Sequence, residues 1–293
     1  MNNFSISELS RYSGLKPFII RTWEKRYEAL KPNRSPGNTR HYNGEQLRRL
    51  LNIASLADSG YKPSQLCKMK DGELFELVEN LKIPATDQNA EFFVSQIISA
   101  GLLFDENSFN NLFAHCLLRF GLYESWVKVM YPVLNRVGLM WSCNRIGAGN
   151  EHFLTNLLNR KLIAATDLLP SPHMKSSSWT LFLPENEFHE TGLLMANYMI
   201  RQAGEKTIYL GSNMPLELSL NVAEQNKCDY LLLFLVHQDS PDQIKSYINK
   251  LQRKFNGKKI FVALEGTESG LGFSKKIHCL HSPGDLLRVL ATV

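Results

Sequence analysis

The sequence predicts a multidomain protein of the α and α/β classes. It combines an N-terminal winged helix-turn-helix, a four-helix bundle and a C-terminal Rossmann-like (flavodoxin-like) parallel sheet. Residues 1–70 hold 13 Lys and Arg against 5 Asp and Glu, whereas the rest of the chain holds 20 against 23. Residues 75–169 repeat apolar side chains at helical spacing, and residues 179–293 alternate strand-like and helix-like runs. We therefore expect domains at 1–72, 75–169 and 179–293.

Local signals place the first two helices. Ser5 and Glu8 form the S-x-x-E pattern of a capping box, which predicts a helix after Ser5, and Gly14 predicts its end. Pro17 suits the first turn of a second helix, because its missing N–H has no partner there anyway. A Pro-, Gly- and Asn-rich loop then runs to Tyr42, as expected for the β-ribbon of a winged helix.

Four arginines in this head suit contacts with nucleic acid. Arg21 and Arg26 lie on the second helix, and Arg34 and Arg40 lie in the loop, where they can reach phosphates or base edges. The alternative is a solvated basic face over a packed core. The charge balance argues against it, because the excess positive charge of the whole chain is concentrated in the head.

The middle segment, 75–169, has almost no Gly or Pro inside its periodic runs. It predicts four amphipathic helices joined by short breaks, which is the pattern of a helical bundle. These helices cover Phe92–Ala100, Phe109–Phe120, Val127–Met140 and Phe153–Leu162. The break before the segment is Lys70-Asp71-Gly72, and the small, polar run Pro170–Ser178 reads as the linker after it.

The last segment, 179–293, changes period. Strands are predicted at Trp179–Leu183, Thr207–Leu210, Tyr230–Val236, Lys259–Leu264 and Ile277–Leu280. Helices are predicted at Gly192–Ala203, Glu217–Gln225, Pro241–Phe255 and Pro283–Val293. Such alternation predicts an open parallel sheet with helices on both faces, and these sheets bind ligands at the carboxyl ends of their strands, near the switch in strand order.

Two groups of side chains suit ligand chemistry. The loop after the first strand of the sheet carries His189, and Glu187 can hydrogen-bond its far ring nitrogen and fix its tautomer. Gly192 allows the backbone to approach something bulky. In the bundle, Glu151-His152 begins ten residues after Trp141. Each has a simpler alternative: a surface histidine for His189, and core positions for Trp141 and His152.

Composition disfavours several classes of protein. No run of about 18 uncharged apolar residues is present, so we expect no membrane span. The N-terminus lacks the basic-then-apolar pattern of a signal peptide, so we expect a cytoplasmic protein. The cysteines are scattered without a C-x-x-C, which favours buried or idle thiols over a zinc site or disulfides. They are Cys67, Cys116, Cys143, Cys228 and Cys279.

The head resembles the MerR family of bacterial transcriptional regulators. The matching runs are Ile20–Tyr27 (IRTWEKRY), Pro32-Asn33-Arg34 and Arg40-His41-Tyr42, and the resemblance continues to about Met69. It implies DNA contacts from a recognition helix and a wing, although Trp23 fits the core equally well by its helical spacing. The residues implied are Arg21, Trp23, Arg26, Tyr27, Arg34, Arg40, His41 and Tyr42.

The run from Glu187 to Gly192 resembles the D-x-H-x-x-G signature of the cobalamin-binding module, a four-helix cap over a Rossmann-like domain. The resemblance implies cobalt ligated from below by His189. The other binding residues it implies are Trp141, Glu151 and His152 of a W-x9-E-H cap motif, with Glu187 and Gly192. Together with the head, the whole chain resembles the CarH/LitR-type regulators. These use adenosylcobalamin as a light sensor and repress carotenoid or photoprotection genes in the dark as an oligomer.

Three positions depart from that pattern. Phe234-Leu235-Val236 replaces a hydroxyl-bearing run after the third strand, and Glu265 stands where the module has a Gly-Gly pair. Phe234 and Glu265 take space that the buried nucleotide tail of cobalamin needs. Because the run that ends at Val236 has no hydroxyl, it offers the tail no hydrogen-bonding group. Ser142 stands where well-known members carry the His that captures cobalt after photolysis.

The sequence thus predicts a DNA-binding transcriptional regulator that acts on a double-stranded operator as a dimer or tetramer. Its C-terminal half would sense a ligand, with adenosylcobalamin as the candidate cofactor and a light response as one form. The alternative is a cofactor-independent regulator of the MerR type, whose degenerate cobalamin module serves only assembly or protein-partner binding. An enzyme is disfavoured, because the chain has no catalytic barrel or second substrate domain.

Overall fold

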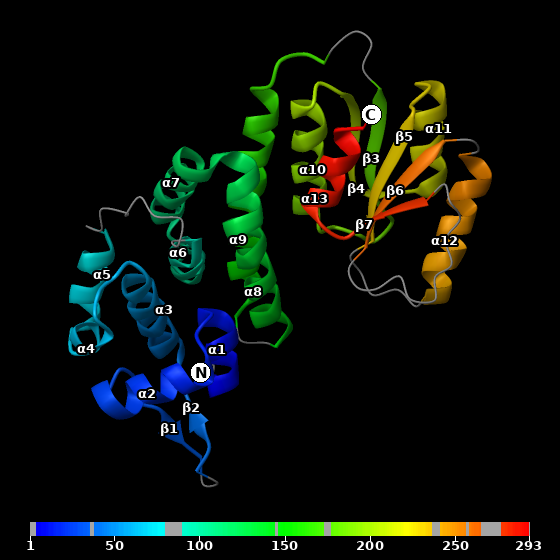
Figure 1. The fold of residues 1–293 in the computed structure, drawn as a ribbon. Helices are drawn as coiled ribbons and strands as arrows, with labels where there is room; N and C mark the ends of the chain where they lie inside the picture. Colours follow the sequence, from blue (N-terminus) through cyan, green and yellow to red (C-terminus); the bar gives the residue numbers. More distant parts are fainter. Residues whose placement is uncertain are drawn as a thin grey trace. The chain divides into compact units, whose positions relative to one another are not determined.

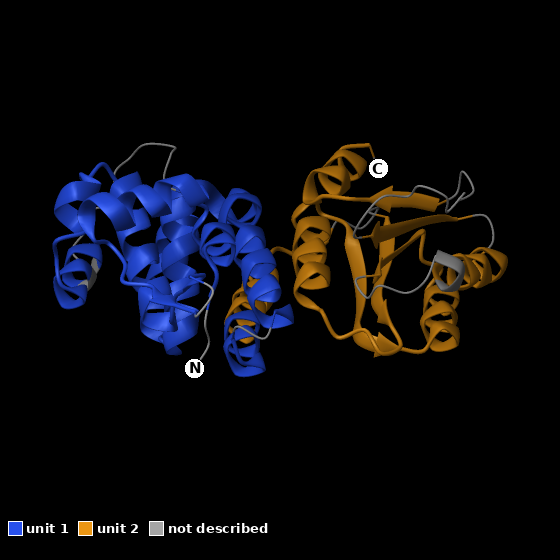
Figure 2. Ribbon diagram, turned by 90° about the horizontal axis from the view of Figure 1, so that it is seen from below, with its two compact units in different colours: residues 1–155 blue, residues 156–293 orange. Residues whose placement is uncertain are grey.

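A computed structural model describes residues 4–35, 38–79, 90–143, 146–172, 177–235, 241–255, 258–264 and 277–292. Its contacts divide into two compact units, residues 1–155 and 156–293 (Figure 2). The three-domain division therefore stays a prediction. None of the described helices combines the length and the apolar character that crossing a bilayer requires.

The first unit begins with the predicted winged helix-turn-helix (Figure 1). Its elements are α1 (Ile6–Ser13), α2 (Pro17–Tyr27), β1 (Asn33–Arg34), β2 (Arg40–His41), α3 (Gly44–Asp58) and α4 (Pro63–Leu66). The capping box of Ser5 and Glu8 is present, and Gly14 ends α1 with a φ of 73°. Strands β1 and β2 pair antiparallel to form the wing, with Asn33 opposite His41.

Helix α5 (Asp71–Glu79) begins where the sequence predicted a break. Gly72 lies in its first turn, and Leu74 is fully buried against the head, where α5 packs on α3. The backbone N–H of Lys70 donates to the Glu73 carboxylate, which satisfies a donor at the start of the helix. The break signal failed because a Gly among acidic first-turn residues is compatible with a helix start.

The four predicted bundle helices are confirmed. They are α6 (Ala90–Leu103), α7 (Glu106–Ser125), α8 (Tyr131–Ser142) and α9 (Ala148–Asp167). Between α7 and α8 the sequence missed a π-helical turn, η2 (Trp126–Met130). The N–H of Tyr131 donates to the carbonyl of Trp126, five residues earlier, just before Pro132. The wider turn keeps the proline ring from clashing with the preceding turn of an uninterrupted α-helix.

The second unit is built on a five-stranded parallel sheet with the order β4-β3-β5-β6-β7. The strands are β3 (Ser178–Pro184), β4 (Lys206–Met214), β5 (Tyr230–Leu235), β6 (Lys259–Leu264) and β7 (Ile277–Leu280). The helices are α10 (Thr191–Gln202), α11 (Leu216–Gln225), α12 (Pro241–Lys254) and α13 (Pro283–Leu290). This is the flavodoxin-like order, and its direction switches between β3 and β5.

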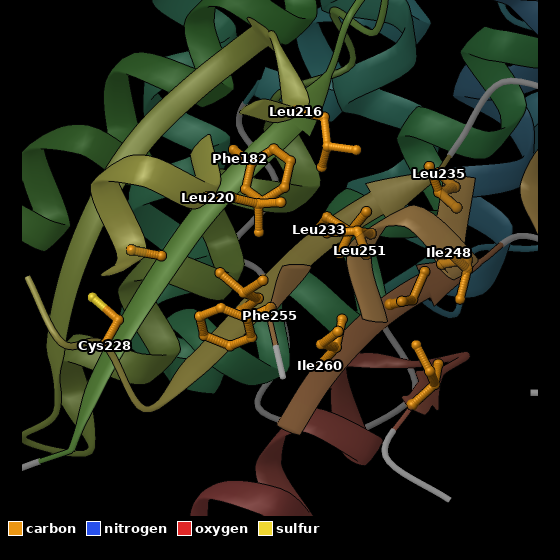
Figure 3. Packing of buried hydrophobic residues seen from close by; sticks show 14 residues of the cluster. Phe182, Leu216, Leu220, Cys228, Leu233, Leu235, Ile248, Leu251, Phe255 and Ile260 are labelled. Atoms are coloured by element: carbon orange, nitrogen blue, oxygen red, sulfur yellow. The ribbon is translucent and has the colours of Figure 1, made fainter. Parts of the chain in front are cut away.

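Both faces of the sheet are covered, which explains why its strands read as continuous apolar runs. Leu231, Leu233 and Leu235 of β5 pack with residues of α11 and α12 in one core (Figure 3). On the other face Trp179 stacks against Tyr230 and Phe261, with ring centroids 4.6 and 5.0 Å away. Helices α10 and α13 lie side by side on this second face (Figure 1).

The five cysteines are free in the described part of the chain. Cys67, Cys116 and Cys228 are buried. Burial raises the pKa of Cys67 to about 11 and that of Cys116 to about 12. Because the thiolate is the nucleophilic form, neither of these two thiols is poised for chemistry near neutral pH.

Candidate DNA interface and candidate cofactor site

Helix α2 separates an apolar face from a basic one. Ile20 and Trp23 are buried, with exposed fractions of 0% and 9%. Arg21 and Arg26 are exposed on the same helix, and Tyr27 is partly exposed. This arrangement leaves cations free to meet phosphates while the apolar face anchors the helix in the head.

The wing carries a second group of cations. Arg34 is exposed in β1, where its guanidinium donates to Oδ1 of Asn38 at 2.5 Å across the turn of the wing. His41 is partly exposed in β2. The guanidinium of Arg34 has the same charge sign as the arginines of α2, so both elements of the winged helix present basic groups to solvent.

Glu24 joins α2 to the wing, and sequence reasoning missed it. Its Oε1 accepts from Nε of Arg40 at 2.8 Å, and its Oε2 accepts the hydroxyl of Tyr42 at 2.7 Å. Tyr42 is fully buried, and burial, reinforced by the Glu24 carboxylate, raises the pKa of its phenol. The sequence did contain a signal for this role, because Glu24 is an acidic residue among the basic residues of α2.

Two predicted DNA contacts are corrected by this burial. Trp23 and Tyr42 lie in the core of the head, so their side chains are not presented to a phosphate or a base. Trp23 and Tyr42 therefore support the basic surface rather than form it. Arg40 is partly exposed and its Nε pairs with Glu24, and its contact with DNA stays a prediction. The remaining residues of the predicted DNA contact set stay predictions.

The head and the bundle are joined by buried polar contacts within the first unit. The side-chain amide of Gln96 on α6 donates to Oδ1 of Asn52 and to Oγ of Ser55 on α3, at 3.2 and 2.8 Å. Arg136 on α8 donates to the carbonyl of Tyr12 on α1 at 3.4 Å and forms a two-pronged ion pair with Glu91 on α6, at 2.5 and 2.8 Å. The head is therefore held to α6 and α8 by side-chain hydrogen bonds.

The predicted cap residues of the bundle lie at the surface. Trp141 ends α8 with 47% of its surface exposed, and the side chain of His152 in α9 is 71% exposed. The Nδ1 of His152 lies 3.4 Å from Oε2 of Glu151. The simpler alternative, in which Trp141 and His152 were core residues, is wrong. Ser142 donates its hydroxyl to the carbonyl of Leu139, at 3.1 Å.

His189 lies in the loop between β3 and α10 and is held by a buried carboxylate. The Nδ1 of His189 lies 2.7 Å from Oε1 of Glu187, which also accepts the backbone N–H groups of Phe188 and His189, both at 2.8 Å. Three donors compensate a carboxylate whose side chain is only 5% exposed. Since a carboxylate only accepts, Nδ1 carries the proton of the bond to Glu187, and Nε2 is the ring nitrogen that a neutral imidazole would offer to a metal. The imidazole is 51% exposed.

Strand β4 braces this loop. The hydroxyl of Tyr209 donates to Oε1 of Glu190 at 2.7 Å, and burial, then Glu190, raises the pKa of Tyr209. The side-chain oxygen of Asn213 accepts the backbone N–H of Asn186 at 2.9 Å. The backbone N–H of Asn213 donates to the carbonyl of Glu187 at 3.0 Å. The loop is thus fixed from both sides before any ligand arrives.

The bulky group that Gly192 admits is the ring of Phe234. A Cβ added to Gly192 would lie 2.8 Å from Cε1 and 3.2 Å from Cδ1 of that ring. Gly192 opens α10 beside β3, and Phe234 is on β5, so the pair lies at the switch in strand order. Val236 and Glu265, the other predicted obstacles, lie outside the described residues.

The described residues fit one half of a cobalamin site. Among them, no group of three or more His, Cys, Asp and Glu could hold a metal ion by itself. In this part of the chain, His189 could supply one nitrogen ligand to a metal that is also held by other groups. We call the space over the Cα of Gly192 the cradle. It does not fit a buried nucleotide tail, because the ring of Phe234 fills it.

Residues 4–73 match the model of the MerR HTH family regulatory proteins, and residues 94–165 match the model of the B12 binding domain. The chain joins a MerR-type DNA-binding domain to a B12-binding module. The MerR-type domain coincides with the winged helix and its basic surface. The match to the B12-binding module covers most of the bundle, including Trp141, Glu151 and His152.

Two relatives align with most of the chain. The chain is 23% identical over 258 residues to the HTH-type transcriptional repressor CarH of Myxococcus xanthus, which covers 85% of this chain and 84% of that protein. It is 23% identical over 256 residues to the repressor CarA of the same organism, with coverages of 85% and 82%. The head alone is 29% identical over 70 residues to the transcriptional regulator MlrA of Escherichia coli, over 24% of this chain and 29% of that protein.

A solved structure shares the fold of the rest of the chain. The monomethylamine corrinoid protein of Methanosarcina barkeri superposes with a TM-score of 0.53 at 13% identity, over 69% of this chain and 98% of that protein. This confirms the predicted combination of a helical bundle with a Rossmann-like sheet.

Proposed function

We propose that this protein is a transcriptional regulator that binds a double-stranded operator through its MerR-type domain and responds to a corrinoid through its B12-binding module. The observation that carries the proposal is the pairing of an exposed basic surface with a histidine held ready by Glu187. The relatives that span most of the chain are transcriptional repressors, which supports regulation rather than catalysis. Action on DNA would place the protein in the cytoplasm.

DNA would be read by paired heads. Arg21, Arg26 and Tyr27 of α2 would meet the major groove, while Arg34 and His41 of the wing would meet the backbone. One head covers only a half-site, so two copies on a palindromic operator double the contact. The regulator would therefore act as a dimer or tetramer.

Self-association would use apolar groups on the bundle. Phe104 and Tyr131 are 54% and 44% exposed and suit such a surface. Trp126 is only 4% exposed and belongs to the bundle core, so it is not part of this surface. A chain that remains monomeric by light scattering, with and without DNA and corrinoid, contradicts the association.

In the ligand response, His189 would hold the corrinoid through a ring nitrogen and Glu187 would fix the tautomer of His189. A bound corrinoid would supply a cobalt centre that can exchange a ligand. The residues of the bundle cap, Trp141, Glu151 and His152, stay predictions for the same ligand, as does any response to light.

A cofactor-independent regulator is the second candidate, and the ring of Phe234 over Gly192 favours it. Incubation of the full-length protein with adenosylcobalamin, and in parallel with adenosylcobinamide, which lacks the nucleotide tail, followed by gel filtration and a visible spectrum in the dark and after illumination, separates the two. A protein-bound spectrum that His189→Ala alters supports the corrinoid regulator. Colourless protein that binds its operator with the same affinity in all conditions supports the cofactor-independent one.

A further inference from the structure

We propose that the B12-binding module takes a corrinoid that lacks the nucleotide tail, with Phe234 occupying the place of that tail. The inference rests on the proposed corrinoid response and specifies the ligand of the same site. It follows from two observations that point in different directions: a histidine prepared for a metal, and a filled cradle beside it.

The histidine side of the site is intact. Glu187 is buried, accepts three N–H donors from its own loop and directs the protonated Nδ1 of His189 to itself. Burying a carboxylate to orient a half-exposed imidazole has a desolvation cost that a histidine without a ligand does not require. The arrangement therefore supports retained metal ligation at Nε2.

The tail side of the site is filled by a fitted pair. Residues alternate between the faces of a strand, so Phe234 lies on the face opposite to Leu233 and Leu235, which belong to the core under α11 and α12. Its ring sits where any residue larger than Gly192 would collide with it. Phe234 is only partly buried, so it closes the cradle at the carboxyl end of the sheet.

The position of the pair decides which ligand enters. His189 follows β3, and Phe234 is at the end of the neighbouring β5. A group attached below a macrocycle on His189 would pass along this end of the sheet, where the crevice of such folds lies. Phe234 blocks that path, whereas the macrocycle itself, on the outer side of the imidazole, does not need it.

Methylcobinamide and methylcobalamin are a matched pair of probes for this selectivity. They share the corrin ring and the upper methyl group, which leaves only the lower face to His189, and they differ in the nucleotide tail. Full-length protein is titrated with each in the dark, and binding and ligation are followed in the visible spectrum. We expect methylcobinamide to bind at least about tenfold more tightly than methylcobalamin, because the tail would have to displace a packed ring.

Three variants accompany the titration. Phe234→Ser removes the ring that fills the space over Gly192. It should raise the affinity for methylcobalamin at least about tenfold and leave the affinity for methylcobinamide little changed, so that most of the difference between the two probes disappears. Phe234→Leu keeps much of the apolar bulk and should preserve the preference. His189→Ala should abolish the spectral change with both probes, while circular dichroism verifies that each variant is folded.

The outcomes separate two failures. If the unmodified protein binds both probes equally and His189→Ala abolishes ligation of both, the tail is accommodated and the inference is wrong, while the corrinoid regulator stands. If neither probe gives a spectral change that depends on His189, with the unmodified protein and with Phe234→Ser, the proposed corrinoid response fails and the inference fails with it.

Discussion

Tyr42 donates its hydroxyl to Oε2 of Glu24 at 2.7 Å, and this bond ties the end of the wing to α2. The other oxygen of the same carboxylate accepts from Arg40 at 2.8 Å. One partly buried acid therefore joins two basic elements that we expect to reach DNA together. We infer that Glu24 helps to hold Arg21 on α2 and Arg34 on the wing in their relative positions.

Replacing Glu24 with Ala should loosen the wing. The buried hydroxyl of Tyr42 loses its acceptor, and the variant should lose about 1–3 kcal/mol of unfolding free energy. Operator affinity should also fall. Glu45 is an exposed acid of the head, so Glu45→Ala is the matched control. It should leave the unfolding free energy and the operator affinity nearly unchanged. Urea unfolding and fluorescence anisotropy measure the two effects, and equal affinities for the two variants would contradict the positioning role.

Removal of single arginines should separate phosphate contacts from base contacts. Arg34→Ala should weaken binding to all sequences alike and lower the slope of affinity against salt by about 1. Arg21→Ala and Arg26→Ala should each cost about 1–3 kcal/mol and relax the sequence preference where they reach a base. Arg253 is exposed on α12, so Arg253→Ala removes the same charge far along the chain and serves as the control. If Arg253→Ala weakens operator binding as much as the head variants do, the loss of affinity comes from net charge alone.

Gly101 should be the bundle position least tolerant of a methyl group. A Cβ there would lie 2.3 Å from Cδ1 and 2.5 Å from Cγ of Leu154, so α6 and the start of α9 would have to separate. Gly101→Ala should lose about 1–3 kcal/mol in chemical unfolding. Gly138→Ala in α8 meets nothing within 4 Å and should instead gain about 0.5–1 kcal/mol. If Gly101→Ala and Gly138→Ala both stabilised the protein, the close packing of Gly101 against Leu154 would be contradicted.

Gln96 should couple the bundle to the head. Gln96→Leu leaves Oδ1 of Asn52 buried without this donor and should cost about 1–3 kcal/mol of stability. Hydrogen exchange in α3 should rise together with exchange in α6, because the contact joins the two helices. Faster exchange in α6 alone would show that the head is held by other contacts.

Asp105 should contribute stability that depends on pH. Its carboxylate caps α7 by accepting the backbone N–H of Ser108 at 3.0 Å and the hydroxyl of Ser108 at 2.7 Å, and these bonds lower the pKa of Asp105. The folded state thus favours the ionised form, so the contribution is present at neutral pH and is lost as pH falls from about 5 to about 2.

Asp105→Asn provides the comparison for this titration, because Asn also caps helices but does not ionise. The stability of the unmodified protein, measured by urea unfolding, should fall relative to that of the variant as the solution is acidified. Parallel pH profiles for the two proteins would show that the carboxylate does not titrate in this way.

The sequence by itself determined most elements of both units, apart from α5 and the π-helical turn η2, and the order of the candidate site residues along the chain. The capping box at Ser5, the helix end at Gly14 and the strand–helix alternation after residue 179 depend on residues a few positions apart, so a linear reading recovers them. The same is true of Glu187 and His189, whose hydrogen bond spans two positions.

Only the tertiary structure decided which predicted residues remain at the surface and what fills the ligand cradle. Trp23 and Tyr42 looked like part of a DNA-binding run, but packing buries them, because helix and wing share one small core. The sequence flagged Phe234 as an obstacle, yet its contact with Gly192 joins residues 42 positions apart on different elements. Such contacts arise from the pairing of strands and the packing of helices on them, which no local pattern encodes.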